Sequence, residues 1–400
     1  ALGFTGADAE AFVGRALLFV AIFTVAQLLA GHRLPAFEGP ASVILAAILL
    51  ALDHAHPNDP VRAVAGGLVL SGVVLAVIGV TGLARAVARV YTQFVTAIFL
   101  LLLAAAIAWA LLPDAVGAGG PGGPAWPGWP GARPVAFVLV VGISLSLDLW
   151  AAGVWRTLSI LLGFLAGLAV FLAAGSLGSA PSGGSMLGLA IVRPAFDPAV
   201  ALPVAIGGLL AGLNGLATLN AVSAATGTKV SGRRLAPAFV VTGLSHAVQG
   251  VVPGVGSVPR ADSAALAARD PVLARPSLAL ACVALAAVAL TPAAVRFVLR
   301  LPEALAADVL LAVMASLTVL ALRILRRTRW NRARAAVFAL SLVAGGLLVP
   351  GPPDWLPRGL QYVAASPVGI GLLVALVGEA LLLRREGQSR GRSEATASTR

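Results

Sequence analysis

The sequence predicts an all-α polytopic membrane protein, and three observations lead to that prediction. Of the 400 residues, 59% are hydrophobic and 11% are charged, whereas soluble domains average about 45–50% and about 25%. The mean hydropathy is +0.96, and apolar stretches recur from one end of the chain to the other. The basic residues, which give a net charge of +12, lie in short clusters between these stretches. They indicate membrane topology and not nucleic-acid binding, and an ordinary soluble enzyme is excluded.

Thirteen apolar segments are candidates for membrane spans. A spanning helix needs about 20 mostly apolar residues, and a broken half-helix buried against protein needs fewer. The second and ninth segments are short enough to be of the broken kind. The thirteen segments cover residues 11–30, 35–51, 62–83, 90–112, 134–153, 157–178, 198–226, 234–251, 254–268, 275–295, 302–325, 335–349 and 360–383.

The loops between these segments differ in charge. Counted alternately, one side receives most of the arginines, including those of residues 323–334 and of the tail after Leu383. The positive-inside rule makes that side cytoplasmic, so the acidic loop 53–59 and the Gly/Pro/Trp-rich loop 113–134 lie outside. We therefore expect a multi-pass protein of a bacterial-type plasma membrane with a cytoplasmic C-terminus. Thirteen spans would leave the N-terminus outside, so a further span before Ala1 is expected.

No catalytic or metal-binding pattern is visible. The single cysteine, Cys282, lies in an apolar run, so neither a disulfide framework nor a paired-thiol metal site can form. Metal-ligand spacing, a nucleotide-phosphate loop and a nucleophile elbow are also missing from the sequence. We expect no enzymatic activity, no cofactor and no bound metal.

Two pairs of segments predict an inverted internal repeat. Arg85-Ala-Val-Ala-Arg89 and Arg296-Phe-Val-Leu-Arg300 each precede an apolar run, at an offset of 211 residues. Residues 34–40 and 252–259 each interrupt an apolar stretch with Pro and Gly. Interruptions at corresponding places in two halves are typical of the binding site of secondary transporters. A helix that begins there leaves free N–H groups, which a polar substrate or an anion can satisfy.

The stretch from Gly243 to Ala264 resembles the ninth and tenth helices of the xanthine/uracil permeases, the nucleobase:cation symporter or nucleobase/ascorbate transporter family. In that family a Gly-Leu-x-x-x-x-x-Gly helix leads through a proline-rich break into a Ser/Gly-Glu-Asn-Ile-Gly motif. Aligned from Gly243 and Gly250, the family's acidic residue falls on Asp262 and its asparagine on Ser263. Residues 34–42 are similar to the family's third helix, and residues 292–311 to its turn between helices eleven and twelve.

The resemblance implies fourteen helices in two inverted sevens, with a core domain and a gate domain, of which about 13 segments are present and the first helix is absent. It also implies a homodimer formed through the gate domains. The implied division is 1–83 for the first part of the core domain (helices 2–4), 84–180 for the first part of the gate domain (helices 5–7), 181–298 for the second part of the core domain (helices 8–11), 299–386 for the second part of the gate domain (helices 12–14) and 387–400 for a disordered cytoplasmic tail.

The sequence departs from the family at several site positions. No acidic residue lies between Ala199 and Thr228, where the family's eighth helix has a glutamate. The glutamate of the tenth helix is shortened to Asp262, and Arg260 stands two positions before it. An arginine beside a half-helix N-terminus favours an anion or an ion pair with a nearby acid.

The candidate substrate-binding residues share polar or aromatic side chains near the two breaks or on the segment 198–226. An Asn amide can donate to and accept from a nucleobase edge, although hydrogen bonding between helices is an equal alternative. Asn214 and Thr218 share a helix face. The candidates are Asp262, Ser263, Asn214, Asn220, Ser42 and Phe37.

Two carboxyl groups are candidates for proton coupling. An unpaired carboxylate in hydrocarbon is costly, so Asp262 should be protonated, paired or bound to substrate. Glu38, in the first break, is the second candidate, with capping of a half-helix as the structural alternative. Arg260 is a possible anion contact. His246, in the middle of a segment, is better explained as a packing residue than as a proton relay.

These observations give three functional hypotheses. The first is proton-coupled, or sodium-coupled, uptake of a nucleobase such as uracil, xanthine or another purine-like ring, with the core moving against the gate. The alternative is an anion transporter of the sulfate-permease type that uses Arg260 and half-helix dipoles. The third is a membrane scaffold or degenerate paralogue without transport. The expected partners are the small molecule, the coupling ion, the lipid bilayer and a second copy of the chain.

Overall fold

The structure, a computed structural model, describes residues 6–55, 57–115, 132–178, 191–228, 232–269, 275–347 and 368–382. Within these ranges the regular structure is helical apart from two strands of three residues each. Six of the described helices are long and apolar enough to cross a membrane, or seven if one bent pair counts as a single span. The prediction of an all-α polytopic membrane protein is confirmed. The predicted tail 387–400 and most of the loop 113–134 lie outside the described residues.

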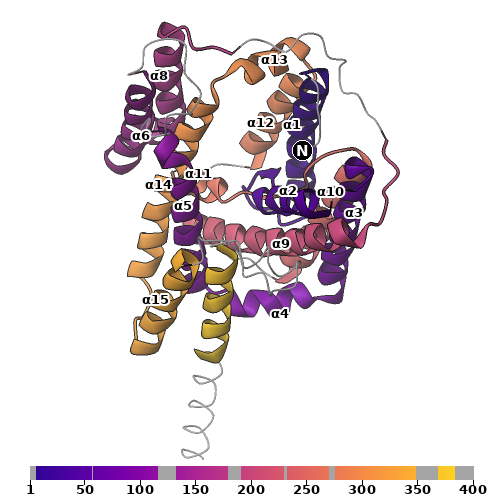
Figure 1. Ribbon diagram of the computed structural model, residues 1–400. Coiled ribbons are helices and arrows are strands. Elements are labelled where there is room, and N and C mark those ends of the chain that lie inside the picture. The colour runs from indigo at the N-terminus through magenta and orange to yellow at the C-terminus, as the bar shows by residue number, and fades with distance from the viewer. Residues whose placement is uncertain are drawn as a thin grey trace, which may run out of the picture.

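Each of the thirteen predicted segments contains a helix or a strand followed by a helix (Figure 1). The first half contains α1 (Gly6–Leu29), β1 (Glu38–Pro40), α2 (Ser42–Ala55), α3 (Pro60–Thr81), α4 (Leu83–Val90), α5 (Gln93–Ala115), α6 (Ala132–Trp150), α7 (Val154–Thr157) and α8 (Ser159–Ala173). The second half contains α9 (Pro198–Thr226), α10 (Gly232–Val251), β2 (Ser257–Pro259), α11 (Asp262–Arg269), α12 (Arg275–Ala289), α13 (Pro292–Arg300), α14 (Glu303–Arg326), α15 (Arg332–Leu347) and a last helix, Val368–Leu382.

Local signals explain where the long helices begin and end. Before α3, the side chain of Asp59 accepts a hydrogen bond from the N–H of Arg62, and Pro60 takes the first helical position. The same Asp-Pro arrangement starts α9, where Asp197 accepts from the N–H of Ala199. Proline suits this position because the first N–H groups of a helix have no partner within it. Both helices end at a glycine in the left-handed region, which relieves the steric cost that a side chain would meet there.

The predicted span 275–295 is divided in the structure. Helix α12 ends at Ala289, and α13 begins at Pro292 after a bend of 92°. Proline lacks the N–H that a continuous helix needs and disfavours helical geometry in the residue before it, here Thr291. Helix α13 is therefore a separate short helix that leads into α14.

The two halves repeat the same order of elements. Long helix, strand, short helix, helix, short helix and long helix follow one another from α1 to α5 and again from α10 to α14. The matching pair Arg85-x-x-x-Arg89 and Arg296-x-x-x-Arg300 lies on α4 and α13, the two short helices that precede the long ones. The offset in the arginine motif thus locates equivalent elements.

The strands provide a second sign of the repeat. β1 and β2 pair antiparallel, with Glu38 opposite Pro259, Gly39 opposite Val258 and Pro40 opposite Ser257. The first residue of each strand faces the last residue of the other, so the pairing is symmetric about its centre. An antiparallel pair of equivalent strands is the arrangement that an inverted repeat produces. The sequence located both breaks but did not predict that they would be strands.

Helices of one half also pack on helices of the other half: α3 packs on α10, and α1 packs on α12. The backbones of α3 and α10 come very close where two glycines face each other. A Cβ on Gly72 would lie 2.5 Å from the carbonyl oxygen of Gly243, and a Cβ on Gly243 would lie 2.5 Å from that of Gly72. Small residues at a crossing allow this approach, which is typical of helix packing in membranes.

The helices form two groups (Figure 1). Helices α1, α2, α3, α10 and α12 gather on one side, and α5, α6, α8, α14 and α15 on the other. Helix α9 touches both groups, because it packs on α2, α3 and α11 and also on α5. A large buried apolar cluster that includes Phe99, Leu216 and Leu317 joins α5, α9 and α14.

One arginine that breaks the charge rule has a partner. Arg296 of α13 lies 3.3 Å from the carboxylate of Glu10, which is buried near the start of α1. Counted along the alternating loops of the sequence, both residues are predicted to lie on the side opposite the arginine-rich loops. An ion pair explains how an arginine is accommodated on the side that ordinarily has few basic residues.

Candidate functional site

The two breaks meet through their backbones. Besides the strand pairing, the N–H of Ala41 donates to the carbonyl of Gly256 (3.1 Å) and the N–H of Arg260 donates to the carbonyl of Phe37 (3.0 Å). Non-helical backbone at membrane depth needs such partners, because no bulk water is available there. The two breaks are therefore a stable part of the fold, because each supplies hydrogen-bond partners for the backbone of the other.

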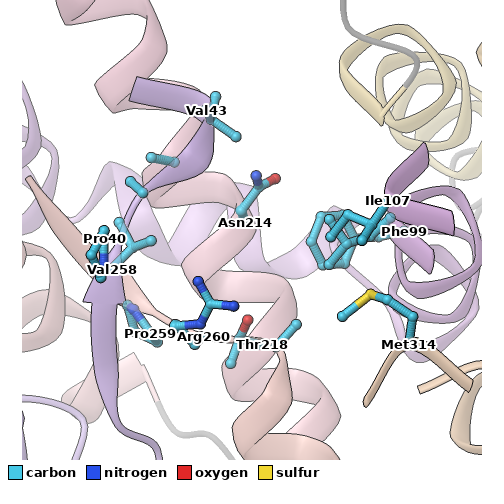
Figure 2. Close-up of a pocket in the computed structure, with 14 residues that line it drawn as sticks. Pro40, Val43, Phe99, Ile107, Asn214, Thr218, Val258, Pro259, Arg260 and Met314 are labelled. Carbon is cyan, nitrogen blue, oxygen red and sulfur yellow. The ribbon is translucent and has the colours of Figure 1, made fainter. Parts of the chain in front are cut away.

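A pocket lies between the strand pair and the second group of helices. It has a volume of about 60 Å³, and β1, β2 and α9 form one wall while α5 and α14 form the other (Figure 2). The space holds a few water-sized groups. The lining residues are Pro40, Ala41, Val43, Phe99, Leu103, Ile107, Ala211, Asn214, Thr218, Val258, Pro259, Arg260, Ala261 and Met314.

Three polar side chains line the first wall. Asn214 and Thr218 lie one turn apart on the same face of α9, and the guanidinium group of Arg260 lies beside them (Figure 2). The aliphatic part of Arg260 crosses directly over Gly39, where a Cβ would overlap the Arg260 Cδ. A side chain at position 39 would therefore force the Arg260 side chain to shift from this path.

The opposite wall is apolar. Phe99, Leu103 and Ile107 follow one another at intervals of four on α5, and Met314 comes from α14. An aromatic ring and a polarisable thioether suit one face of a flat ring, while amide, hydroxyl and guanidinium groups suit its polar edge. The pocket can therefore recognise a small planar solute with hydrogen-bonding edges, or a small anion held by Arg260.

The predicted site residues fall into three sets. Arg260 and Asn214 line the pocket. Ser263, Phe37 and Asn220 do not, and each has a structural contact. The hydroxyl of the buried Ser263 accepts from the N–H of Phe37 (3.1 Å) and so joins α11 to the residues before β1. The amide of Asn220 donates to the carbonyl of Tyr91 (2.9 Å) and joins α9 to the start of α5.

Ser42 and Asp262 form the third set. They are the first residues of α2 and α11, next to the lining residues Ala41 and Ala261. Their side chains lie outside the part of the chain that the structure describes. Their assignment to substrate and proton binding stays a prediction, while the backbone places both helix N-termini at the pocket.

Glu38 is buried but does not line the pocket. Only 1% of its surface is exposed, and its Oε1 lies 3.9 Å from Nε2 of the fully buried His32. The backbone N–H of Glu38 donates to the hydroxyl of Thr24 on α1 (2.8 Å). Glu38 therefore belongs to the contact between β1 and α1, behind the pocket wall.

His246 is a packing residue, as the sequence indicated. Its Nε2 lies 3.1 Å from the carbonyl of Ser257, and its Nδ1 lies 2.8 Å from the hydroxyl of Ser71. A carbonyl only accepts, so Nε2 carries the hydrogen and Nδ1 accepts from Ser71. Both ring nitrogens are satisfied, and His246 holds β2 against α3 and α10.

Sequence reasoning missed the apolar wall of the pocket. The spacing of Phe99, Leu103 and Ile107 marks one face of a helix, but nearly every residue of that run is apolar, so no face stands out. Only the position of α5 opposite α9 shows which face meets the pocket.

The chain is similar to a known family and to a solved structure. Residues 3–353 match a family model labelled Xan_ur_permease and described as a permease family. The solved transmembrane domain of BicA, a bicarbonate transporter of a cyanobacterium, is similar at 15% sequence identity with a TM-score of 0.49, and the match covers 94% of this chain and 96% of that chain.

Proposed function

This chain belongs to the xanthine/uracil permease family, and from that premise we propose that it is a secondary active transporter of a nucleobase or a similar small heterocycle, driven by protons. Membership of a permease family supports membrane transport itself. The observation that most favours a heterocycle is the pocket, which sets Asn214, Thr218 and Arg260 opposite Phe99 and Met314.

In the proposed mechanism the cargo sits between the two broken segments. Asn214 offers a donor and an acceptor to one edge of the ring, and Phe99 packs on its face. The two half-helix N-termini, at Ser42 and Asp262, present backbone N–H groups to its oxygen atoms. The Asp262 carboxyl group accepts from ring N–H groups, and its protonation adds to the coupling.

Alternating access then takes the form of one group of helices moving against the other. The group built on α1, α3, α10 and α12, together with both strands, forms the core, and α5, α6, α8, α14 and α15 form the gate. Because the pocket has one wall from each, relative motion opens it to either side. We further propose a homodimer through the gate and a cytoplasmic C-terminus, in agreement with the arginines between α14 and α15.

A second candidate function, anion transport, rests on Arg260. Its guanidinium is the one charged group among the pocket-lining residues that the structure describes. A site with a cation and two half-helix N-termini also suits a small oxyanion.

Uptake into proteoliposomes distinguishes these functions. The full chain is reconstituted, an inward proton gradient is imposed, and radiolabelled uracil, xanthine, guanine and sulfate are offered separately. Uptake of a nucleobase that is lost in Asn214→Ala and Asp262→Asn supports the first proposal. Sulfate uptake that survives Asp262→Asn and is lost in Arg260→Gln supports anion transport, and no uptake of any of the four contradicts both.

A further inference from the structure

We infer that Glu38 carries a coupling proton outside the substrate pocket and that His32 is a positioning residue that stabilises the unprotonated form of Glu38. The role in coupling rests on the proposed function, whereas the proton site itself rests on geometry alone. The site is separate from the substrate pocket and lies behind its wall. The inference thus assigns a partner, His32, to Glu38 and places the pair outside the pocket.

Because Glu38 is buried, the stability of its surroundings depends on whether its carboxyl group carries a proton. Its side chain is 1% exposed, and neither carboxyl oxygen has a hydrogen-bond partner among the described residues. A buried carboxylate without hydrogen bonds is costly, so the group is stable there with a proton bound. The unprotonated form needs a donor that comes close when the proton leaves.

The bonding of His32 makes it such a donor. The N–H of Leu34 donates to its Nδ1 (3.0 Å), and because an amide N–H only donates, the ring hydrogen must be on Nε2. Nε2 faces Glu38 Oε1 at 3.9 Å. The lone pair of Nδ1 is occupied, so His32 stays neutral and offers one N–H, while the proton binds on Glu38.

The other buried acids of the described residues have a different partner. Glu10, Asp148 and Glu379 lie 3.3, 3.5 and 3.9 Å from Arg296, Arg156 and Arg334. Asp308 differs from these three, because neither of its carboxyl oxygens has a hydrogen bond among the described residues and Arg133 acts on it only through its charge. Arginine keeps its charge and favours a permanent carboxylate beside it, which suits a structural ion pair. Among these five, Glu38 is the one whose carboxyl group faces a histidine. A neutral histidine, unlike an arginine, does not hold a permanent carboxylate beside it, so Glu38 can gain and lose a proton.

The surroundings of Glu38 connect it to the pocket. Within the strand pair it lies opposite Pro259, which lines the pocket. The next residue, Gly39, is crossed by the side chain of Arg260. Besides His32 and Arg260, the titratable group in this region is Cys282 of α12, whose thiol contacts Thr24. The Asp262 side chain lies outside the described residues.

A network also holds His32 in place. Gln27 accepts from the N–H of His32 (3.3 Å) and donates to the carbonyl of Ala238 and the hydroxyl of Thr242 on α10. The pair is thus anchored to both halves of the chain. In the proton step, an O–H bond forms on Glu38 as a proton arrives from water, and the same bond breaks on release to water on the other side, with no other covalent change.

Infrared difference spectroscopy on the full chain in lipid tests this inference without a substrate. The carbonyl stretch of a protonated carboxylic acid is followed across pH. We expect one such band to be lost in Glu38→Gln, to persist to higher pH in His32→Leu, and to return to its original range in His32→Gln, which keeps an N–H donor. Asp308→Asn, which removes the other buried acid without a hydrogen bond, should remove at most a separate band and leave the Glu38 band in place.

A band that survives in Glu38→Gln overturns the assignment of the proton site, and a band unaffected by His32→Leu overturns the role of His32. Thermal unfolding of each purified variant verifies that it is folded.

Xanthine counterflow in proteoliposomes tests the coupling. We expect Glu38→Gln to keep xanthine exchange and to lose accumulation driven by a pH gradient. Accumulation that persists in this variant contradicts a coupling role. If the native chain moves none of the nucleobases, the proposed function fails, whereas the infrared result still decides whether Glu38 and His32 form the proton site.

Discussion

Each half of the chain has a glutamine at an equivalent position, and the two glutamines lie in different surroundings. Gln27 and Gln249 each stand two positions before the last residue of their helix, α1 and α10. The side-chain oxygen of each accepts from a backbone N–H in the residues that lead to the strand, that of His32 in the first half and that of Gly256 in the second. Each glutamine therefore ties a helix end to the break that follows it.

Beyond this shared contact the halves diverge. In the second half, Gln249 also donates to Ser245 and Ser257, and His246 bonds to Ser71 and to the carbonyl of Ser257. That network is neutral and satisfied. In the first half, the strand begins with Glu38, whose carboxyl oxygens have no hydrogen bond among the described residues. A repeated scaffold thus has one half suited to rigidity and the other suited to a change of charge.

Disrupting the neutral network should have the largest effect on stability. His246→Leu leaves the Ser71 hydroxyl and the Ser257 carbonyl without their partner, and each unsatisfied buried group costs about 1–3 kcal/mol. We expect a loss of about 2–6 kcal/mol for the two groups together, measured by thermal unfolding of the purified protein. His246→Gln, which can keep one of the two bonds, should lose less. Equal stability of native protein and His246→Leu would show that the network does not support the fold.

Removing either of the two equivalent glutamines, Gln27 or Gln249, should have the next largest effect on stability. Gln249→Ala and Gln27→Ala each remove three hydrogen bonds, at about 0.5–1.5 kcal/mol per bond. We expect both variants to lose about 1.5–4.5 kcal/mol in the same unfolding assay. A loss for one glutamine without a similar loss for the other would contradict their equivalence.

Helix α9 allows a smaller and more local test. Asn220→Ala removes one hydrogen bond to Tyr91 and should lower stability by about 1 kcal/mol, with nucleobase binding unchanged. Asn214→Ala should do the reverse, with weakened binding and little change in stability. Ligand-dependent thermal shifts with uracil and xanthine measure both effects. Weakened binding in Asn220→Ala but not in Asn214→Ala would show that Asn220 is the amide that binds the substrate.

The smallest effect on stability is expected from a substitution of Glu38, in the first half of the chain. Glu38→Gln replaces a buried carboxyl group that is stable with its proton bound by a neutral side chain of the same shape, so no buried charge is created and no hydrogen bond among the described residues is lost. Thermal unfolding should show a change within about 1 kcal/mol, which is the net value of a single hydrogen bond. A loss as large as that of His246→Leu would mean that Glu38 is structural, in which case the two halves do not differ as described.

How far the sequence predicts these features depends on how local they are. Hydropathy placed all thirteen segments, because burial in lipid acts on each segment separately. Proline and glycine located both breaks, and polarity in an apolar context singled out Arg260 and Asn214, which line the pocket. The strand pairing, the bonds of His246 and the wall at Phe99 depend on contacts between distant segments. Asn220 looked like a site residue because an amide in a membrane helix has the same sequence pattern whether it binds cargo or another helix.

The strand pair also constrains how the protein is made. Glu38 and its counterpart Ser257 are about 220 positions apart, and ribosomes add about 5–20 residues per second. For about 10–40 s, therefore, the first break exists without the strand that satisfies its backbone. Unpaired N–H and C=O groups are costly in hydrocarbon, so the nascent first half should stay at a wet interface or associate with the insertion machinery until the second half arrives.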